Sequence, residues 1–185
     1  MNILRRTLLA SALILPLATP AAWAETPDGI LVVAQNIDDI VSIDPGEAYE
    51  FSSGEYVTQT YDRLVQYDAP DVKTLAPGLA GEWTADDAAK TITFTLRDGV
   101  KFTSGNPLRA EDVVYSWKRV VVLNKAPAFI LTQLGWTPEN FDTMVKADGN
   151  KVVAKYEGDF SPAFVMNVLA SRPVGSPRPT PSRAR

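Results

Sequence analysis

The chain has 185 residues, of which 18 are basic and 22 acidic, and its apolar and charged fractions (45% and 22%) are those of a folded globular protein. It contains no Cys and no His, which excludes disulfides, a zinc site of the usual ligands, and catalysis by a thiolate or an imidazole base. The net charge of −4 argues against nucleic acid as a partner. Carboxylate pairs, Ser-Lys and Tyr chemistry are the catalytic routes that stay open.

Residues 1–24 have the pattern of a secretory signal peptide. Two arginines at positions 5 and 6 precede the apolar run 8–17, and Ala22-Trp23-Ala24 matches the small-x-small pattern of a cleavage site. The run is shorter than the about 20 residues of a membrane span, although a retained anchor is an alternative. We predict export to the periplasm, by the Sec or the twin-arginine route, with cleavage after Ala24. Without the two arginines, 16 basic and 22 acidic groups give a net charge of −6.

The segment from the cleavage site to residue 67 predicts a strand and a helix. Ile30–Ala34 is a continuous apolar run, typical of a strand that is covered on both faces. The helix is predicted to begin at Ser52, because Ser52 and Glu55 have the spacing of a capping box. Its apolar face should pack on the strand and consists of Val57, Tyr61, Leu64 and Val65.

Residues 68–170 have the pattern of a small mixed subdomain. The turn-rich stretch 68–79 leads to a short strand around Trp83 and a second strand in which Ile92, Phe94 and Leu96 alternate with threonines. Asp98-Gly99 predicts a turn. The later pair of strands, Met144–Val145 and Lys151–Tyr156, predicts a hairpin.

Three helices are predicted in the same subdomain. The longest covers Ala110–Val122, and a shorter one covers Ala128–Leu134. The third opens at Ser161-Pro162. Thr137-Pro138 could also cap a short helical turn. The predicted buried stripes are Val113, Val114, Trp117, Val120 and Val121 on the first helix, and Phe164, Val165, Val168 and Leu169 on the third.

Residues 171–185 differ in character from everything before them. They hold four Arg, four Pro and no acid, and they show no hydrophobic period. Such a composition predicts a disordered basic tail that could touch anionic surfaces. The interpretation that we prefer is out-of-frame translation of a GC-rich gene.

The stretch 97–120, RDGVKFTSGNPLRAEDVVYSWKRV, contains eight charged side chains. Those at its start flank a turn, and those in Ala110–Val122 should occupy the solvated face of the helix. No two of the carboxylates have a spacing that demands general acid-base chemistry. We therefore interpret the stretch as structural, with no catalytic residue.

Two longer segments carry a family resemblance. LAPGLAGEWTADDAAKTITFTLRDGVKFTSGNPLRAEDVVYSWKRV, residues 75–120, resembles the signature of the extracellular solute-binding proteins of family 5, the dipeptide, oligopeptide and nickel receptors of ABC importers. SIDPGEAYEFSSGEYVTQTYDRLVQYD, residues 42–68, fits the same family. The resemblance extends from about Leu31 to Arg172.

The resemblance implies an α/β (mixed α+β) fold of the periplasmic-binding-protein type. Residues 25–67 would be the N-terminal part of the first lobe, residues 68–170 a small mixed subdomain, and the second lobe would be missing, since family members are much longer. It also implies a monomeric receptor without enzymatic activity or cofactor, which binds a small peptide or similar solute and passes it to an ABC permease in the inner membrane. As a truncated piece, the chain is not expected to bind its ligand tightly alone.

The resemblance places ligand contacts in the segment after the LDP-like motif, at Tyr49, Glu50, Phe51 and Ser52. A carboxylate there could meet a ligand ammonium group, and aromatic rings could cover ligand side chains. The alternative is that Tyr49 and Phe51 belong to the core and Ser52 only caps a helix. Neither a catalytic residue nor a metal ligand is predicted.

The sequence departs from the family pattern at Arg109, and two other functions are alternatives to a receptor. The family usually has Thr where Arg109 stands, and since Arg cannot accept a hydrogen bond, the helix from Ala110 should lose a side-chain cap at a cost of about 1 kcal/mol. The rival functions are a small secreted hydrolase that uses carboxylates and a stand-alone extracytoplasmic binding module.

Overall fold

The computed structural model describes residues 26–68, 70–171 and 176–177, and it divides into two units, residues 1–35 and residues 36–185. The predicted signal peptide lies outside the described residues. The described part of the first unit, residues 26–35, forms one turn and no strand. The predicted strand Ile30–Ala34 is therefore wrong. Its residues 30–33 are 57–85% exposed, and a strand cannot persist without a neighbour for its backbone groups.

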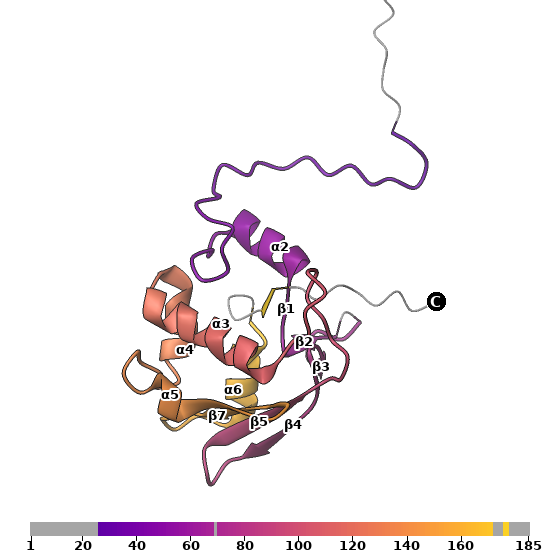
Figure 1. Ribbon diagram of the computed structural model, residues 1–185. Helices are drawn as coiled ribbons and strands as arrows, with labels where there is room; N and C mark the ends of the chain where they lie inside the picture. Colours follow the sequence, from indigo (N-terminus) through magenta and orange to yellow (C-terminus); the bar gives the residue numbers. More distant parts are fainter. Residues whose placement is uncertain (1–25, 69, 172–175, 178–185) are drawn as a thin grey trace, which may run out of the picture. The chain divides into compact units, whose positions relative to one another are not determined.

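The second unit contains a four-stranded antiparallel sheet (Figure 1). Its strands are β4 (Ala80–Asp86), β5 (Thr91–Leu96), β6 (Val145–Asp148) and β7 (Lys151–Lys155), in the order β4-β5-β7-β6. The two predicted strands around Trp83 and Phe94, and the predicted hairpin, are confirmed. The turn at Asp98-Gly99 is confirmed as well, with Gly99 at a φ of 74°. On β5, Ile92 and Phe94 are fully buried, as their alternation with threonines predicts.

Helix α3 (Ala110–Leu123) packs on this sheet against β6 and β7 (Figure 1). Four residues of its predicted stripe are buried and Val114 is partly buried. As predicted, Arg109 supplies no side-chain acceptor. The carboxylate of Asp112 instead accepts a hydrogen bond from the backbone N–H of Arg109, with an N···O distance of 2.9 Å. This half of a capping box satisfies one donor at the helix start, so the helix keeps its first turn.

Four short helical segments complete the subdomain: η2 (Ala126–Ala128), α4 (Phe129–Thr132), α5 (Phe141–Met144) and α6 (Pro162–Leu169). The helix predicted over Ala128–Leu134 is shorter than expected, because the chain after Thr132 continues in i→i+3 hydrogen bonds, from Leu134 N–H to Leu131 and from Gly135 N–H to Thr132, both at 3.0 Å. The cap predicted at Thr137-Pro138 is confirmed: the Thr137 hydroxyl accepts a hydrogen bond from the backbone N–H of Asn140 at 3.3 Å, and the Thr137 carbonyl accepts from the N–H of Phe141, the first residue of α5, at 3.0 Å.

Helix α6 begins where the sequence predicts, and one of its predicted core residues is misplaced. The hydroxyl of Ser161 accepts a hydrogen bond from the backbone N–H of Phe164 at 3.3 Å. The Phe164 ring itself is 41% exposed and stacks on Phe160 with a centroid separation of 4.9 Å. Met166 is buried instead, so the apolar stripe of the helix is rotated from the predicted one.

The N-terminal part of the second unit contains α2 (Phe51–Thr60), β1 (Tyr61–Asp62), β2 (Val65–Tyr67) and β3 (Leu75–Pro77). The predicted helix exists, but Glu50 is its N-cap and it ends at Thr60. The next residues form strands instead, since β2 pairs with β3 and β1 pairs with β8 (Ser176–Pro177). The helix therefore ends before Tyr61, Leu64 and Val65. In the predicted tail, residues 171–185, the structure describes Ser171 and the two residues of β8.

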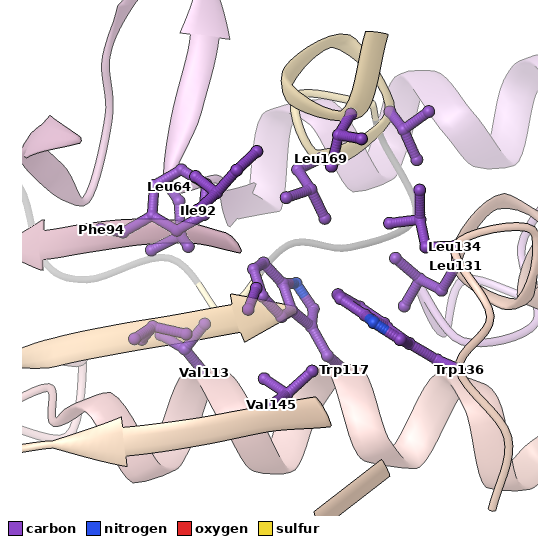
Figure 2. Packing of buried hydrophobic residues seen from close by; sticks show 14 of the residues in the cluster. Leu64, Ile92, Phe94, Val113, Trp117, Leu131, Leu134, Trp136, Val145 and Leu169 are labelled. Carbon is purple, nitrogen blue, oxygen red and sulfur yellow. The ribbon is translucent and has the colours of Figure 1, made fainter. Parts of the chain in front are cut away.

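One buried cluster joins the four-stranded sheet to β2, α3, α4 and α6 (Figure 2). At its centre the ring centroids of Trp117 and Trp136 lie 5.5 Å apart, and the Trp136 indole N–H donates to the carbonyl of Lys155 at 2.7 Å. Leu64 and Val65 belong to the same cluster as Trp117. The core therefore crosses residue 68, where the boundary between lobe and subdomain is predicted.

Candidate ligand-binding site

The predicted ligand segment lies at the end of a loop and the start of α2. Tyr49, Glu50 and Phe51 line a concavity of about 450 Å³, whereas Ser52 does not. The structure thus gathers three of the four predicted residues on one surface. The other lining residues are Ala48, Gly54, Val57, Ile130 and Ser171.

The two aromatic side chains of the segment are not core residues. Tyr49 is 51% exposed and Phe51 is 88% exposed. The Tyr49 ring meets the Phe129 ring edge to face, with a centroid separation of 5.6 Å and an interplanar angle of 77°. The alternative that both aromatics pack in the core is therefore wrong, and both rings are available to a ligand.

Glu50 is the N-cap of α2 and also carries a charged carboxylate. As N-cap of α2 it has extended backbone angles, and its carbonyl accepts a hydrogen bond from the N–H of Gly54 at 2.8 Å. Its carboxylate accepts from the N–H of Tyr49 at 3.2 Å. Hydrogen bonds from the backbone of Glu50 and then of Tyr49 hold the pKa of the Glu50 carboxyl below its ordinary value. The group is therefore an anion at neutral pH.

Ser52 faces the preceding loop. Its backbone N–H donates to the Asp39 carboxylate at 3.1 Å, and hydrogen bonds from the side chain and then the backbone of Ser52 lower the pKa of Asp39. Since Glu50 is the N-cap, the alternative that Ser52 caps the helix is also wrong. Ser52 ties the loop to α2, and its direct contact with a ligand stays a prediction.

Ile130 and Ser171, together with Phe129, were not predicted from the sequence. They follow the segment by about 80 residues and more, and no local pattern marks them. The Ser171 hydroxyl oxygen is buried, and none of the described residues hydrogen-bonds to it.

Most of the charged stretch 97–120 is solvated, as predicted, and Arg119 is an exception. Its guanidinium donates two hydrogen bonds to the carboxylate of Asp44, at 2.7 and 2.5 Å. Asp44 belongs to the loop that precedes the ligand segment. The two side chains are 37% and 35% exposed, so the pair lies at the protein surface.

No group of three or more His, Cys, Asp or Glu side chains among the described residues could hold a metal ion. None of their helices has the length and apolar character to cross a membrane.

Residues 74–179 match the family model described as bacterial extracellular solute-binding proteins, family 5, middle. The match covers more than half of the chain. The chain belongs to this family. The prediction from the sequence is thereby confirmed, and so is the mixed α/β fold.

Similar proteins have names that refer to the binding of peptides and of nickel. The probable D,D-dipeptide-binding periplasmic protein of Escherichia coli (strain K12) is 37% identical over 127 residues, which are 67% of this chain and 24% of that protein. The nickel-binding periplasmic protein of the same strain is 33% identical over 65% of this chain and 22% of that protein. The chain thus spans about a quarter of the length of these relatives.

A solved structure extends the likeness to three dimensions. The crystal structure of Haemophilus influenzae OppA in complex with RPPGFSPFR matches 73% of this chain and 28% of its own, with 26% identity and a TM-score of 0.61. The matched proteins are binding proteins rather than enzymes, and the named relatives are periplasmic.

Proposed function

We propose that this chain is a section of a periplasmic receptor of an ABC importer and that it contributes one wall of the binding site for a peptide or similar solute. The observation that carries the proposal is the concavity beside Tyr49, Glu50 and Phe51, in a chain of this family. Names of similar proteins refer to a D,D-dipeptide and to oligopeptides, and these support a peptide as the ligand class.

The chemistry of the wall suits a peptide. The Glu50 carboxylate is charged and exposed, so it can accept hydrogen bonds from a ligand ammonium group. Tyr49 and Phe51 present ring faces to apolar ligand groups.

Binding without catalysis is the activity that we propose. A carboxylate hydrolase needs one carboxyl group that keeps its proton near neutral pH, which requires a raised pKa. The pKa values of Glu50 and Asp39, the carboxyls of this region, are both lowered. This direction disfavours the hydrolase as a rival.

The remaining parts of the proposal concern location and organisation. We propose that the signal peptide is removed after Ala24, that the mature receptor is a monomer that docks on a permease of the inner membrane, and that nucleic acid is not a partner. Residues 25–67 would belong to the first lobe and residues 68–170 to the mixed subdomain. The wall is open, and since tight sites enclose most of their ligand, we expect this chain alone to bind a tripeptide with a Kd of about 1 mM or weaker.

The test is a titration of ¹⁵N-labelled residues 25–185 with tri-L-alanine, followed by NMR. We expect shift changes at residues 48–54, 129–130 and 171. Glu50→Gln should weaken the affinity about tenfold, because it removes one charge-assisted hydrogen bond, and Tyr49→Ala should weaken it as well.

Two variants serve as matched controls. Glu82→Gln changes the same functional group on β4, and Tyr115→Ala removes a tyrosine that is 68% exposed on α3. Neither should alter the titration. Shift changes that avoid residues 48–54, or an affinity that is the same in the Tyr49 and Glu50 variants as in the original chain, would remove this segment from the binding site.

A further inference from the structure

The loop that leads to the ligand segment has no regular secondary structure to fix it. Residues 36–48 form turns and bends, and the segment Tyr49–Ser52 follows directly. The position of the segment therefore depends on contacts that the loop makes with the rest of the unit.

Asp44 is the centre of these contacts. Its backbone carbonyl accepts hydrogen bonds from the N–H groups of Glu47 and Ala48, at 2.9 and 2.7 Å. Its carboxylate accepts from the N–H of Gly46 at 2.8 Å. These bonds close residues 44–48 into a tight turn, and Ala48, at its end, is 6% exposed.

Arg119 fastens this turn to α3. Two of its N–H groups bind both oxygens of the Asp44 carboxylate, a geometry that Arg provides and Lys cannot. The helix is itself fixed, because the neighbouring residues Trp117, Val120 and Val121 are 0–3% exposed in the core. Arg119 thus connects the loop, which has no regular secondary structure, to α3, which is fixed by its buried residues.

Gly46 shows that the approach of the two elements is close. A Cβ atom at this position would lie 2.8 Å from the Nη1 atom of Arg119 and 3.1 Å from a methyl carbon of Leu123. Any side chain here would displace the guanidinium from Asp44. Glycine at position 46 therefore permits the pair to form.

We infer that Arg119 is a positioning residue for the binding site: through Asp44 it fixes to α3 the loop that leads to the segment Tyr49–Ser52, and so holds this segment in place. The inference rests on the proposed function for the meaning of the site, while the positioning itself is a property of the chain without ligand. Arg119 and Glu50 are 69 residues apart in the sequence, so the pair joins the subdomain to the ligand wall.

Amide hydrogen exchange of residues 25–185 without ligand tests the positioning. In Arg119→Gln, the amides of Ala48, Ser52 and Gly54 should exchange faster, by up to about fivefold, because local opening becomes easier, while those of β5 keep their rates. Arg119→Lys keeps the charge but cannot form two parallel hydrogen bonds, so its exchange rates should lie between those of the original chain and those of Arg119→Gln. Gly46→Ala should loosen the same amides.

Lys118→Gln is the matched control. It removes the ion pair between Lys118 and Asp142, 2.5 Å long, from the adjacent position of the same helix, and the loop should keep its exchange rates. Unchanged rates at residues 48–54 in both Arg119→Gln and Gly46→Ala would overturn the inference, and so would equal acceleration in β5. If Arg119→Gln does not fold, Arg119→Lys and Gly46→Ala decide by the same criterion.

The tri-L-alanine titration separates this inference from the proposed function. Faster exchange at residues 48–54, with an affinity that is unaffected by Tyr49→Ala and Glu50→Gln, would leave the positioning role intact and reject the site. If the inference and the proposed function are both correct, Arg119→Gln weakens the affinity for tri-L-alanine and Lys118→Gln does not.

Discussion

A carboxylate that receives three hydrogen bonds at a surface, as Asp44 does from Gly46 and twice from Arg119, has a defined charge state. Such an exposed pair contributes modestly to stability, under about 1 kcal/mol. The pair matters more for geometry than for stability, because the planar guanidinium fixes the orientation of the loop relative to α3. The surrounding charges of the stretch 97–120 mostly lack this geometry and remain solvated.

The pH dependence of stability should reveal this pair. Hydrogen bonds from Arg119 hold the pKa of Asp44 below its ordinary value of 3.8. A carboxyl group whose pKa is lowered by folding stabilises the fold above its unfolded-state pKa, and this contribution is lost as the pH falls through the folded-state pKa. We expect Asp44→Asn to reduce the free energy of unfolding at neutral pH and to have a shrinking effect below about pH 4. Urea unfolding across this range measures it.

The double variant supplies the control for that experiment. In a chain that already carries Arg119→Gln, the pKa of Asp44 loses its main cause of lowering, so the further change Asp44→Asn should have a weaker dependence on pH. The same pH dependence in both backgrounds would mean that another group, rather than Arg119, stabilises the carboxylate.

Among the elements, helix starts were predicted with unequal success for a physical reason. Ser161 caps α6 as its sequence predicts, and Pro162 fills the first helical position. Ser52 has an equally good pattern, yet Asp39 binds its N–H and Glu50 takes the cap position. A capping pattern is local, whereas the partner that competes for it lies 13 residues away, so the sequence alone cannot rank the two.

The cap of α6 is a prediction that can be measured. Ser161→Ala should lower the free energy of unfolding by about 1 kcal/mol, because the N–H of Phe164 loses its acceptor. Ser104→Ala, at an exposed turn, is the matched control and should stay within about 0.5 kcal/mol of the original chain. Equal midpoints of urea unfolding in the two variants would argue that water replaces the cap without loss.

Across the whole chain, predictions succeeded where the determining contacts are near in sequence. The strand pair β4-β5 and the hairpin β6-β7 are joined by short turns, and their alternation is visible in the residues themselves. Only part of the ligand wall was predicted. The family resemblance indicated Tyr49, Glu50 and Phe51, whereas Ile130 and Ser171 are distant in the sequence and come close to them only in the folded chain. The strand at Ile30–Ala34 failed because strand formation depends on a partner, which a hydrophobic run does not specify.

That run has a consequence for the behaviour of the chain in solution. Residues 30–33 are β-branched or leucine, uncharged and 57–85% exposed, and such a segment can pair with its copy in another molecule. We expect the chain to self-associate as its concentration rises, and Val32→Glu to suppress the association by placing a charge in the run. Sedimentation velocity over a range of concentrations measures it. Thr26→Glu adds the same charge outside the run and should have little effect; equal suppression by both variants would assign the change to net charge rather than to the exposed run.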